Sequence, residues 1–403
     1  MDTDDVINYN KKSVTDIPVS GKKVLLRCDF NVPRDKATGE ITDTSRIAAS
    51  LPTISYLLEH GAAVIACSHL GRPKGEWKPE LSLAPVARSL SGMLSKPVKM
   101  AKDVVGEDAQ KLAAELMPGE IMLLENLRYH NEEEKNDPEF VKALAGLADI
   151  FVSDAFGAVH RAHASTEGVS HYLPAVSGFL LKKELDNLGG AISDPKRPLI
   201  AILGGSKISD KLGVIENLLK KADSLLIGGG MAYTFIKAQG GKIGNSLCED
   251  DKLEYTLKML DEAKALGKKL LLPVDTVAGT EFSNNSQPII VNSANIPDGM
   301  MGLDIGPCAA EEFAHEIAGA GTVVWNGPMG VFEFPTFAAG TKSVARAIVE
   351  SGAVSVVGGG DSAAAVRGFG LEGRISHIST GGGASLKFLE GKILPGIACL
   401  LDA

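Results

Sequence analysis

Residues 23–33 read KVLLRCDFNVP, a short apolar run that ends in polar residues and Pro33. A continuous apolar run of this length is typical of a strand that is buried on both faces of a parallel sheet. Ligands of open α/β sheets bind at the carboxyl ends of the strands. The stretch therefore predicts one strand of the fold, and it marks Asp29 and Asn31 as residues to inspect for function.

Similar runs follow along the whole chain and alternate with segments of helical periodicity. This alternation predicts parallel sheets that are covered by helices. The runs are AVIACSH from Ala63, EIMLLEN from Glu120 and IFVSDAF from Ile150 in the first half, and LIAILGG from Leu199, SLLIGGG from Ser224, KLLLPVD from Lys269, TVVWNGP from Thr322, VSVVGGG from Val354 and HISTGGG from His377 in the second half.

The chain has 403 residues, of which 44% are hydrophobic, and this length suits two lobes better than one core. A predicted amphipathic helix that ends near Leu188 is followed by Gly189, Gly190, Pro195 and Pro198, as expected of a connector. The sequence therefore predicts an α/β protein with two Rossmann-like, doubly wound parallel-sheet lobes that are joined by a helix and a hinge.

The formal net charge of −9 argues against nucleic acid or an anionic membrane as the main partner, because both require a broad basic surface. An anion site in this chain must then be a local basic cluster. The five cysteines include no C-x-x-C pair, so we expect reduced thiols. The start MDTDDVINYNKK lacks the apolar stretch of a signal peptide, and no run is long enough for a membrane helix, so we expect a cytoplasmic location.

Basic side chains follow the predicted strands of the first half and fall on one predicted face. Arginine presents a planar fork of donors that matches phosphate and carboxylate groups, so this set predicts a grip for a small polyanion. Taken singly, Arg46 and Arg128 could be surface ion-pair partners and His69 a half-buried core histidine. Their recurrence at successive strand ends favours the anion site. The set is Arg46, His69, Arg72, Arg128, His160, Arg161 and His163.

Asp29 and Asn31 have two interpretations. They could shape the turn into Pro33, because Asp and Asn side chains bond to nearby backbone. They could equally contact a hydroxyl group of a substrate. The residues alone leave both interpretations open.

The predicted strands of the second half end in glycines, which let backbone N–H groups approach a ligand and leave helix N-termini open to phosphate. Such loops suit a nucleotide, although they also serve tight packing of a strand against a helix. The string G-x-G-x-x-A at Gly358, Gly360 and Ala363 is a weak signal alone. The chain contains no P-loop and neither the H-R-D nor the D-F-G motif of protein kinases, so the nucleotide site must be of another kind.

Lys207 and Lys211 lie four residues apart in GGSKISDK, directly after a predicted strand. If a helix starts there, both ammonium groups lie on one face near its positive end, which favours phosphates. The alternative is a solvated helix face, and the preceding Gly204 and Gly205 favour phosphate binding. Asp361, which follows the VSVVGGG run, is then a candidate Mg²⁺ ligand.

Twelve motifs, taken in order, resemble those of the phosphoglycerate kinase family from about Gly21 to the C-terminus. A set of ordered motifs across nearly the whole chain is far more specific than any one of them. The motifs are RCDFNVP, SHLGRP, LSLAPVA, ENLRYHNEEEKND, SDAFGAVHRAHAS, GFLLKKEL, GGSKISDK, IGGGMAYTF, LDIGP, WNGPMGVFE, VVGGGDSAAAV and STGGGASLKFLEGK.

The resemblance implies reversible transfer of the acyl phosphate of 1,3-bisphosphoglycerate to Mg-ADP, giving 3-phosphoglycerate and ATP, in glycolysis, gluconeogenesis or carbon fixation. It implies Mg²⁺ with ADP or ATP, small-molecule substrates without nucleic acid or membrane, and a monomer that closes by hinge bending. It also implies a triose-phosphate domain over residues 1–184, a nucleotide domain over residues 185–388, and a segment over residues 389–403 that returns to the first domain.

The resemblance also assigns site residues. The triose phosphate site resembles Asp29, Asn31, Arg46, His69, Arg72, Arg128 and Arg161. The nucleotide site resembles Gly205, Lys207, Lys211, Gly229, Asn326, Glu333, Gly358, Gly359, Gly360, Asp361 and Ser362, with Asp361 as the protein ligand to the metal. The catalytic set resembles Arg46, Lys207, Gly359 and Gly382, and Gly381 to Gly383 open a helix that faces the transferring phosphoryl group.

Two other classes of protein share parts of this pattern. A nicotinamide dehydrogenase would explain the G-x-G-x-x-A string, but the acidic residue about 20 positions further on is not evident. A two-lobed binding protein of periplasmic type would explain the hinge, but it would need a signal peptide and would not need Lys207, Lys211 and Asp361. The kinase is therefore the favoured hypothesis.

Overall fold

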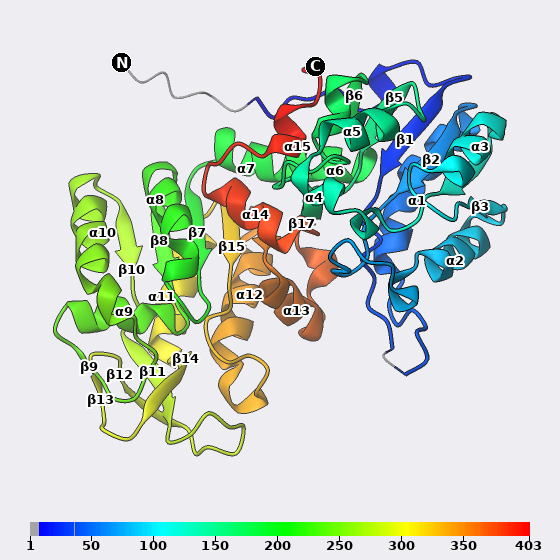
Figure 1. The fold of residues 1–403 in the computed structure, drawn as a ribbon. Coiled ribbons are helices and arrows are strands. Elements are labelled where there is room, and N and C mark those ends of the chain that lie inside the picture. The colour runs from blue at the N-terminus through cyan, green and yellow to red at the C-terminus, as the bar shows by residue number, and fades with distance from the viewer. Residues whose placement is uncertain (1–7, 36) are drawn as a thin grey trace. The chain divides into compact units, whose positions relative to one another are not determined.

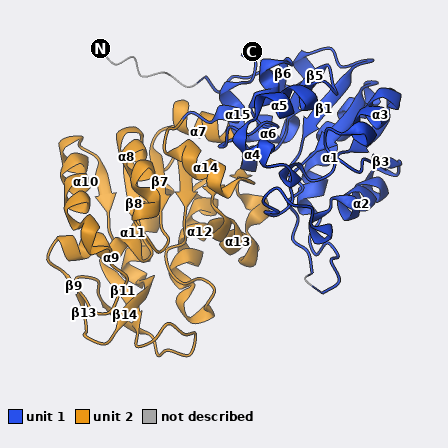
Figure 2. Cartoon of the chain, in the orientation of Figure 1, with its two compact units in different colours: residues 1–186, 393–403 blue, residues 187–392 orange. Residues whose placement is uncertain are grey.

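The computed structural model describes residues 8–35 and 37–403, which form two compact units. Unit 1 holds the described residues up to 186 together with residues 393–403, and unit 2 holds residues 187–392 (Figure 1, Figure 2). The chain leaves unit 1 after Asp186 and returns to it after Lys392. The sequence predicts these crossings after residues 184 and 388.

Unit 1 is built on a six-stranded parallel sheet with the strand order β3-β4-β2-β1-β5-β6. The order runs outward from β1 in both directions, and the carboxyl ends beside such a switch point form the usual ligand crevice. The register pairs Arg27, the last residue of β1, with Cys67 of β2 and Ser153 of β5. The strands are β1 (Lys23–Arg27), β2 (Ala63–Cys67), β3 (Val98–Met100), β4 (Ile121–Leu123), β5 (Ile150–Ser153) and β6 (Ala175–Ser177).

Both faces of this sheet are buried. Val24 and Leu26 share one core with Ile54 of α1 and Leu90 of α2, and Leu25 on the opposite face is also fully buried. Strands covered on both faces contain continuous apolar runs, which is why the sequence reveals them. The helices of unit 1 are α1 (Ser45–Glu59), α2 (Ala84–Leu94), α3 (Glu107–Glu115), α4 (Asn131–Lys135), α5 (Pro138–Ala145), α6 (Phe179–Glu184) and α15 (Pro395–Ala398).

Unit 2 contains a second six-stranded parallel sheet with the order β10-β8-β7-β15-β16-β17. Numbered along the chain within this sheet, the order is 3-2-1-4-5-6, which is that of the Rossmann fold. The switch point lies between β7 and β15, which end at Leu203 and Asn326. The strands are β7 (Leu199–Leu203), β8 (Ser224–Ile227), β10 (Lys269–Leu271), β15 (Thr322–Asn326), β16 (Val354–Gly358) and β17 (His377–Ile378).

Helices pack on this sheet as the sequence predicts. Phe313 of α11 and Val344 of α12 share a core with Ile202 and Trp325 of the sheet. The helix α8 contacts β7 and β8, and α14 contacts β16. The helices of unit 2 are α7 (Gly190–Ser193), α8 (Leu212–Lys221), α9 (Met231–Ala238), α10 (Leu253–Ala265), α11 (Pro307–Ala318), α12 (Ala339–Ser351), α13 (Gly360–Gly368) and α14 (Gly382–Leu389).

Unit 2 also carries two small sheets that the sequence does not predict. One is a three-stranded antiparallel sheet with the order β12-β11-β14, and the other pairs β13 with β9. The strands β9 and β13 have only two residues each, and β12 is largely exposed, so these segments form no continuous apolar run. The strands are β9 (Lys242–Ile243), β11 (Asp275–Gly279), β12 (Ile289–Asn292), β13 (Asn295–Ile296) and β14 (Met301–Ile305).

The connector differs from the predicted helix that ends near Leu188. The helix α6 continues through a π-helical turn over Leu185–Gly189 and then through α7 to Ser193. Two glycines lower helix propensity by only about 1 kcal/mol each, so the helix passes them. It stops at Asp194, because the residue before a proline is disfavoured in the α region.

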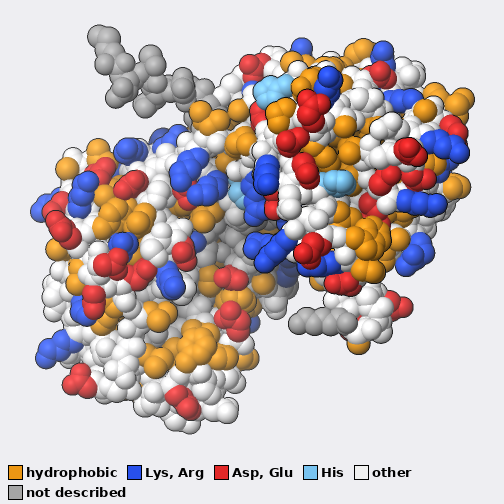
Figure 3. All heavy atoms as spheres, in the orientation of Figure 1, with side chains coloured by type: hydrophobic (Ala, Val, Ile, Leu, Met, Phe, Trp, Pro, Cys, Tyr) orange, Lys and Arg blue, Asp and Glu red, His pale blue; other side chains and the backbone are white. Residues whose placement is uncertain are grey.

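The surface and the thiols agree with the composition. Acidic and basic side chains are interspersed over the face drawn in Figure 3. All five cysteines carry free thiols, as the sequence predicts. Within residues 8–35 and 37–403, no helix is both long enough and apolar enough to span a membrane.

Asp304 of β14 ties the small sheet of unit 2 to α12. Its carboxylate accepts hydrogen bonds from the N–H groups of Gly340 (2.7 Å) and Ile305 (2.9 Å). Burial raises the pKa of Asp304 from 3.8 to about 7, against the effect of these two bonds. The folded chain therefore holds the Asp304 proton to a higher pH than the unfolded chain does.

We expect the stability of the wild type to fall relative to Asp304→Asn as the pH rises from 4 to 7. The unfolded carboxyl ionises near 3.8 and the folded one near 7, so the contribution of the protonated form is complete below 3.8 and is lost up to 7. Urea unfolding at several pH values measures this. Asp298→Asn, on an exposed turn of unit 2, is the control. A wild-type-to-variant difference that does not depend on pH would contradict the assignment.

Candidate active site

The basic residues of unit 1 meet around His69, which lies two residues beyond the end of β2. Its ring accepts or shares a hydrogen bond at Nδ1 with Nη2 of Arg27 (3.1 Å). Burial, Arg27, Arg128, Arg161 and Arg46, in that order, hold the pKa of His69 well below its ordinary value. Four guanidinium groups therefore act on one neutral imidazole at the carboxyl edge of the sheet.

Asp29 and Asn31 make structural contacts at this edge. One carboxylate oxygen of Asp29 accepts from the Asn31 N–H (3.2 Å), as in the predicted turn, and the other pairs with Nη1 of Arg46. The Oδ1 atom of Asn31 accepts from the Gly71 N–H (2.9 Å), while Nη1 of Arg128 donates to the Gly71 carbonyl (2.9 Å). The Gly71 peptide thus links Asn31 to Arg128.

Arg161 lies on the turn that follows β5. Its Nε donates to Nε2 of His160 (3.1 Å), and its carbonyl accepts from the Thr166 hydroxyl (2.6 Å). Burial and nearby arginines, with Arg128 first, lower the pKa of His163 to about 4, so this ring is also neutral. His160 therefore holds the Arg161 side chain, and the neutral His163 adds no charge to the cluster.

Arg72 is placed differently from the other predicted residues of unit 1. Its side chain is exposed and has no hydrogen-bond or ion-pair partner among the residues that the structure describes. It follows Gly71 directly, so it stands beside the cluster without being fixed in it.

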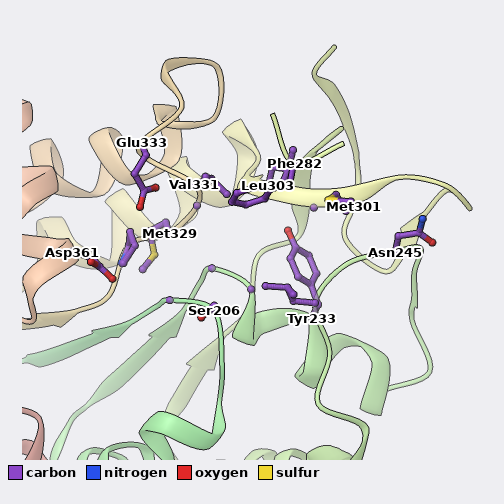
Figure 4. Close-up of a pocket in the computed structure, with 17 residues that line it drawn as sticks. Ser206, Tyr233, Asn245, Phe282, Met301, Leu303, Met329, Val331, Glu333 and Asp361 are labelled. Carbon is purple, nitrogen blue, oxygen red and sulfur yellow. The ribbon is translucent and has the colours of Figure 1, made fainter. Parts of the chain in front are cut away.

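A cavity of about 560 Å³ lies within unit 2 (Figure 4). Its floor includes Gly205 and Gly229, which touch so closely that a Cβ on Gly229 would lie 2.6 Å from the Gly205 backbone. The wall is largely apolar, and the carboxylates of Glu333 and Asp361 stand at the same side. Other lining residues are Tyr233, Asn245, Phe282, Met301, Leu303, Met329 and Val331. A volume and lining of this kind are typical of small-molecule sites.

A polar group adjoins this cavity at the ends of β15 and β16. The Lys211 ammonium donates to Oδ1 of Asn326, and Nδ2 of Asn326 is buried without a hydrogen-bond partner in the described chain. Burial lowers the pKa of Lys211 to about 8, while Asp210 and Asp361 oppose the shift. A Cβ on Gly358 or Gly359 would lie 3.3 Å from Nδ2 of Asn326, so these glycines keep its surroundings open.

Two helix N-termini meet at the same place. The helix α13 begins at Gly360, and α14 begins at Gly382. A Cβ on Gly382 would lie 3.7 Å from the Gly360 nitrogen. Neither helix has a side-chain cap, so the N–H groups of both first turns are available to an anion. The side chain of Ser362, in the first turn of α13, is not open to a ligand in this way. Its hydroxyl is buried and accepts a hydrogen bond from the Gly327 N–H (2.6 Å).

Lys207 and Lys211 do not share a helix, so the condition for placing both ammonium groups on one helix face is not met. A 3₁₀ turn covers Ser209–Lys211, and α8 begins only at Leu212. Glu249 accepts from the N–H and hydroxyl groups of Ser209, which holds this segment in a loop before the helix. Lys207 is therefore an exposed loop residue, separate from the half-buried Lys211.

The donors present fit Mg²⁺ only together with a ligand. Within the described residues no group of three or more His, Cys, Asp and Glu side chains could hold a metal. Asp361 offers one exposed carboxylate in the first turn of α13. Mg²⁺ is usually bound by one or two carboxylates, substrate phosphates and waters, so a single Asp beside an open helix N-terminus suits it.

Two Rossmann-like units, one with a cluster of arginines and the other with a cavity beside a lysine and two helix N-termini, define an α/β phosphotransferase. The chain belongs to the phosphoglycerate kinase family, whose profile matches residues 14–392. Its activity is that of the family, namely phosphoryl transfer between 1,3-bisphosphoglycerate and ADP in glycolysis, and a nucleotide is one of its substrates.

Curated relatives and solved structures agree with this assignment. The phosphoglycerate kinase of Clostridium novyi (strain NT) is 60% identical over 98% of this chain and 100% of the relative. That of Clostridium botulinum (strain Hall) is 58% identical over the same shares. The structure of the enzyme from Coxiella burnetii has a TM-score of 0.90 and 43% identity, covering 96% of this chain and 98% of that chain. The enzyme from Pyrococcus horikoshii has a TM-score of 0.81 and 34% identity, with the same coverage.

Sequence reasoning missed Arg27 and most of the cavity wall. Arg27 lies in the RCDFNVP motif, which gave it no role, and its 1% exposure and its bond to His69 reveal its place. Asn245 and Phe282 come from two loops outside every motif, and Tyr233 comes from a helix whose motif, IGGGMAYTF, directed attention only to its glycines. Leu303 carried a signal, because it lies in the LDIGP motif.

We expect Gly229→Ala to weaken nucleotide binding at least ~10-fold, since one displaced floor contact costs about 1.4 kcal/mol or more. The added Cβ would meet Gly205 backbone atoms at 2.6 Å, and backbone cannot retreat as a flexible side chain can. The matched control is Gly370→Ala, which has nearly the same positive φ (+69° against +67°) but open space around the Cβ. Calorimetric titration of both variants with Mg-ADP measures the effect. Equal losses would show that backbone strain alone acts.

Proposed function

We propose that unit 1 binds the triose substrate and that unit 2 binds the nucleotide. The observation that carries this proposal is the meeting of four guanidinium groups around the neutral His69, because a small polyanion is the ligand that such a cluster fits. The cavity of unit 2 supports the nucleotide half, because its lining is largely apolar and Lys211 and the open N-terminus of α13 adjoin it.

In unit 1 we assign Asp29, Asn31 and Arg46 to the carboxylate and hydroxyl end of 3-phosphoglycerate. The Arg46 side chain is 41% exposed and pairs with only one oxygen of Asp29, so most of its donors stay available. His69, Arg72, Arg128 and Arg161 complete the grip on the anion. Arg72, which is exposed, would be drawn in by the ligand.

In unit 2 we assign the base to the apolar part of the cavity, between Leu303, Met329 and Val331. Glu333 would accept hydrogen bonds from the ribose hydroxyls. Lys211 and the glycines at the start of α13 would hold the phosphates, because a cation and unpaired N–H groups favour negative charge. Gly205 and Gly229 would form the floor, and Asn326 would add its unpartnered Nδ2.

Phosphoryl transfer needs little covalent help, so the protein acts chiefly by positioning and by neutralising charge. Arg46 and Lys207 would flank the moving group, and the N–H groups at Gly359 and Gly382 would face it. Mg²⁺, held by Asp361 and the nucleotide phosphates, would neutralise phosphate charge. No general base is required, since ADP and the carboxylate product are already ionised.

Other parts of the assignment follow from the same proposal. Because the two substrates would be held by different units, we expect the chain to bend in the connector between Ser177 and Leu188 when both are bound. The connector also contains a π-helical turn at Leu185–Gly189, and such turns are frequent at functional sites. We also propose a monomer in the cytoplasm without nucleic acid partners, in keeping with the net charge of −9.

The function is tested with ATP, Mg²⁺ and 3-phosphoglycerate in an assay coupled to the dehydrogenase that reduces the acyl phosphate. Oxidation of NADH should depend on all three components. Folded protein that gives no signal would overturn the proposal.

We expect Arg46→Ala to lower kcat at least ~10²-fold while the fold survives, which is the usual cost of losing a preorganised partner of transition-state charge. Arg88→Ala, on the exposed face of α2, is the control and should retain full activity. Steady-state kinetics with saturating substrates decide the matter. A near-normal kcat would remove Arg46 from the transition-state role.

We expect the affinity for ADP to fall as the pH rises above 8. Lys211 has a pKa of about 8 in the free protein, so it is a cation below that pH and loses its charge above it. Binding above pH 8 should therefore be accompanied by proton uptake. Lys211→Arg keeps the charge at every pH and should remove the dependence. Calorimetry in buffers of different ionisation enthalpy measures the protons, and zero uptake in the wild type at pH 9 would contradict this.

A further inference from the structure

A buried chain of four polar side chains runs behind the basic cluster of unit 1. The Ser165 hydroxyl donates to Oε1 of Glu133 (2.6 Å), and Nε of Arg27 donates to the same hydroxyl (2.8 Å). The Arg27 guanidinium also donates to the Cys28 carbonyl, and its Nη2 lies 3.1 Å from Nδ1 of His69. Glu133, Ser165 and Arg27 are each at most 1% exposed.

The chemistry of Arg27 fixes the direction of the last bond. A guanidinium group has five N–H donors and no acceptor, so Nδ1 of His69 must be the acceptor. An accepting Nδ1 carries no proton, and a neutral imidazole then carries its single proton on Nε2. Burial, Arg27, Arg128, Arg161 and Arg46 all oppose a second proton on this ring.

Nε2 of His69 is the end of the chain. It has no hydrogen-bond partner among the described residues, and the His69 side chain is partly exposed. Arg27 itself is too deeply buried to contact a ligand. Its Nε, Nη1 and Nη2 donors are occupied by Ser165, Cys28 and His69 in turn, which leaves it little freedom to move.

We propose that Arg27 is a positioning residue that holds His69 as the Nε2–H tautomer, so that His69 presents a fixed hydrogen-bond donor to the triose substrate. Glu133, through Ser165, holds Arg27 in place. The inference rests on the proposed triose site, and it adds a role for Arg27 and Ser165 in the affinity for 3-phosphoglycerate.

The wild-type protein provides the first test. Long-range ¹H–¹⁵N correlation spectra of protein with ¹⁵N-labelled histidine report the tautomer of each ring, and His69→Gln assigns the His69 signals. We expect the Nε2–H pattern for His69, unchanged from about pH 5.5 to pH 8, whereas an ordinary histidine titrates near 6.5. An Nδ1–H pattern, or a titration of His69 near 6.5, would overturn the inference.

Arg27→Lys provides the second test, because a compact ammonium cannot serve Ser165, Cys28 and His69 together. We expect the KM for 3-phosphoglycerate to rise about 10-fold, as for the loss of one good hydrogen bond, while the KM for ATP stays within about twofold. The His69 spectrum should then change with pH. Arg34→Lys, at a half-buried arginine that donates to the Ser82 carbonyl, is the matched control and should change neither KM.

The two tests separate the possible failures. If Arg27→Lys does not fold, Ser165→Ala breaks the chain one step earlier and should shift the same KM in the same direction. A KM for 3-phosphoglycerate that His69→Ala leaves unchanged would overturn the triose site at His69, because alanine offers no donor. A raised KM in His69→Ala with an unchanged KM in both Arg27→Lys and Ser165→Ala would overturn only the role of Arg27.

Discussion

Repulsion among guanidinium groups is the constraint on which the carboxyl edge of the unit 1 sheet depends. Arg27, Arg46, Arg128 and Arg161 all act on His69, so their charges lie close together. Two unit charges 4 Å apart near a protein surface repel by roughly 4 kcal/mol. The edge can hold this charge only if carboxylates stand behind it, and three do. Arg46 pairs with Asp29, Arg128 with Glu134 (3.1 Å), and Arg27 reaches Glu133 through Ser165.

The carboxylates occupy only some of the donors of the cluster. Glu133 and Glu134 lie on the short helix α4, where Glu133 accepts from Ser165 and Glu134 pairs with Arg128. Arg46 and Arg128 each have five donors, and the paired carboxylate occupies only one or two of them, so donors remain for a ligand. The neutral state of His69 and His163 follows from the same constraint, because a fifth and sixth charge would meet four like charges. The histidines contribute donors and acceptors without adding to the repulsion.

In unit 2, helix dipoles supply much of the positive potential that arginine side chains supply in unit 1. Lys211 is a half-buried cation beside the cavity, and desolvation already lowers the pKa of its ammonium group to about 8. The open N-termini of α13 and α14 supply a partial positive charge that does not titrate. A partial charge repels the Lys211 ammonium less than a second full charge would. Glycine is required there, since a Cβ on Gly358 or Gly359 would crowd Asn326.

The sequence predicts the parts of this structure that are buried on both faces or repeated at strand ends. The strands of the two large sheets appear as continuous apolar runs, and the basic residues after them form the cluster. The small antiparallel sheet of unit 2 escapes prediction, because Ile289 and Ile290 of β12 are exposed and leave no periodic pattern. Arg27 opens the RCDFNVP motif, yet its role escapes prediction because it depends on a contact with His69, 42 residues away.

Lys207 and Arg72 show a different relation between sequence and structure. The family motifs single out both, yet each is exposed, and neither has a side-chain partner within the described residues. A cation that waits in solvent loses no hydration until an anion arrives, whereas one already paired must break that pair to bind. An exposed, unpaired cation is therefore the arrangement expected of a side chain that binds an anion only when the anion arrives. Its signature lies in the motif around it, because the free protein gives such a residue no contact by which to be recognised.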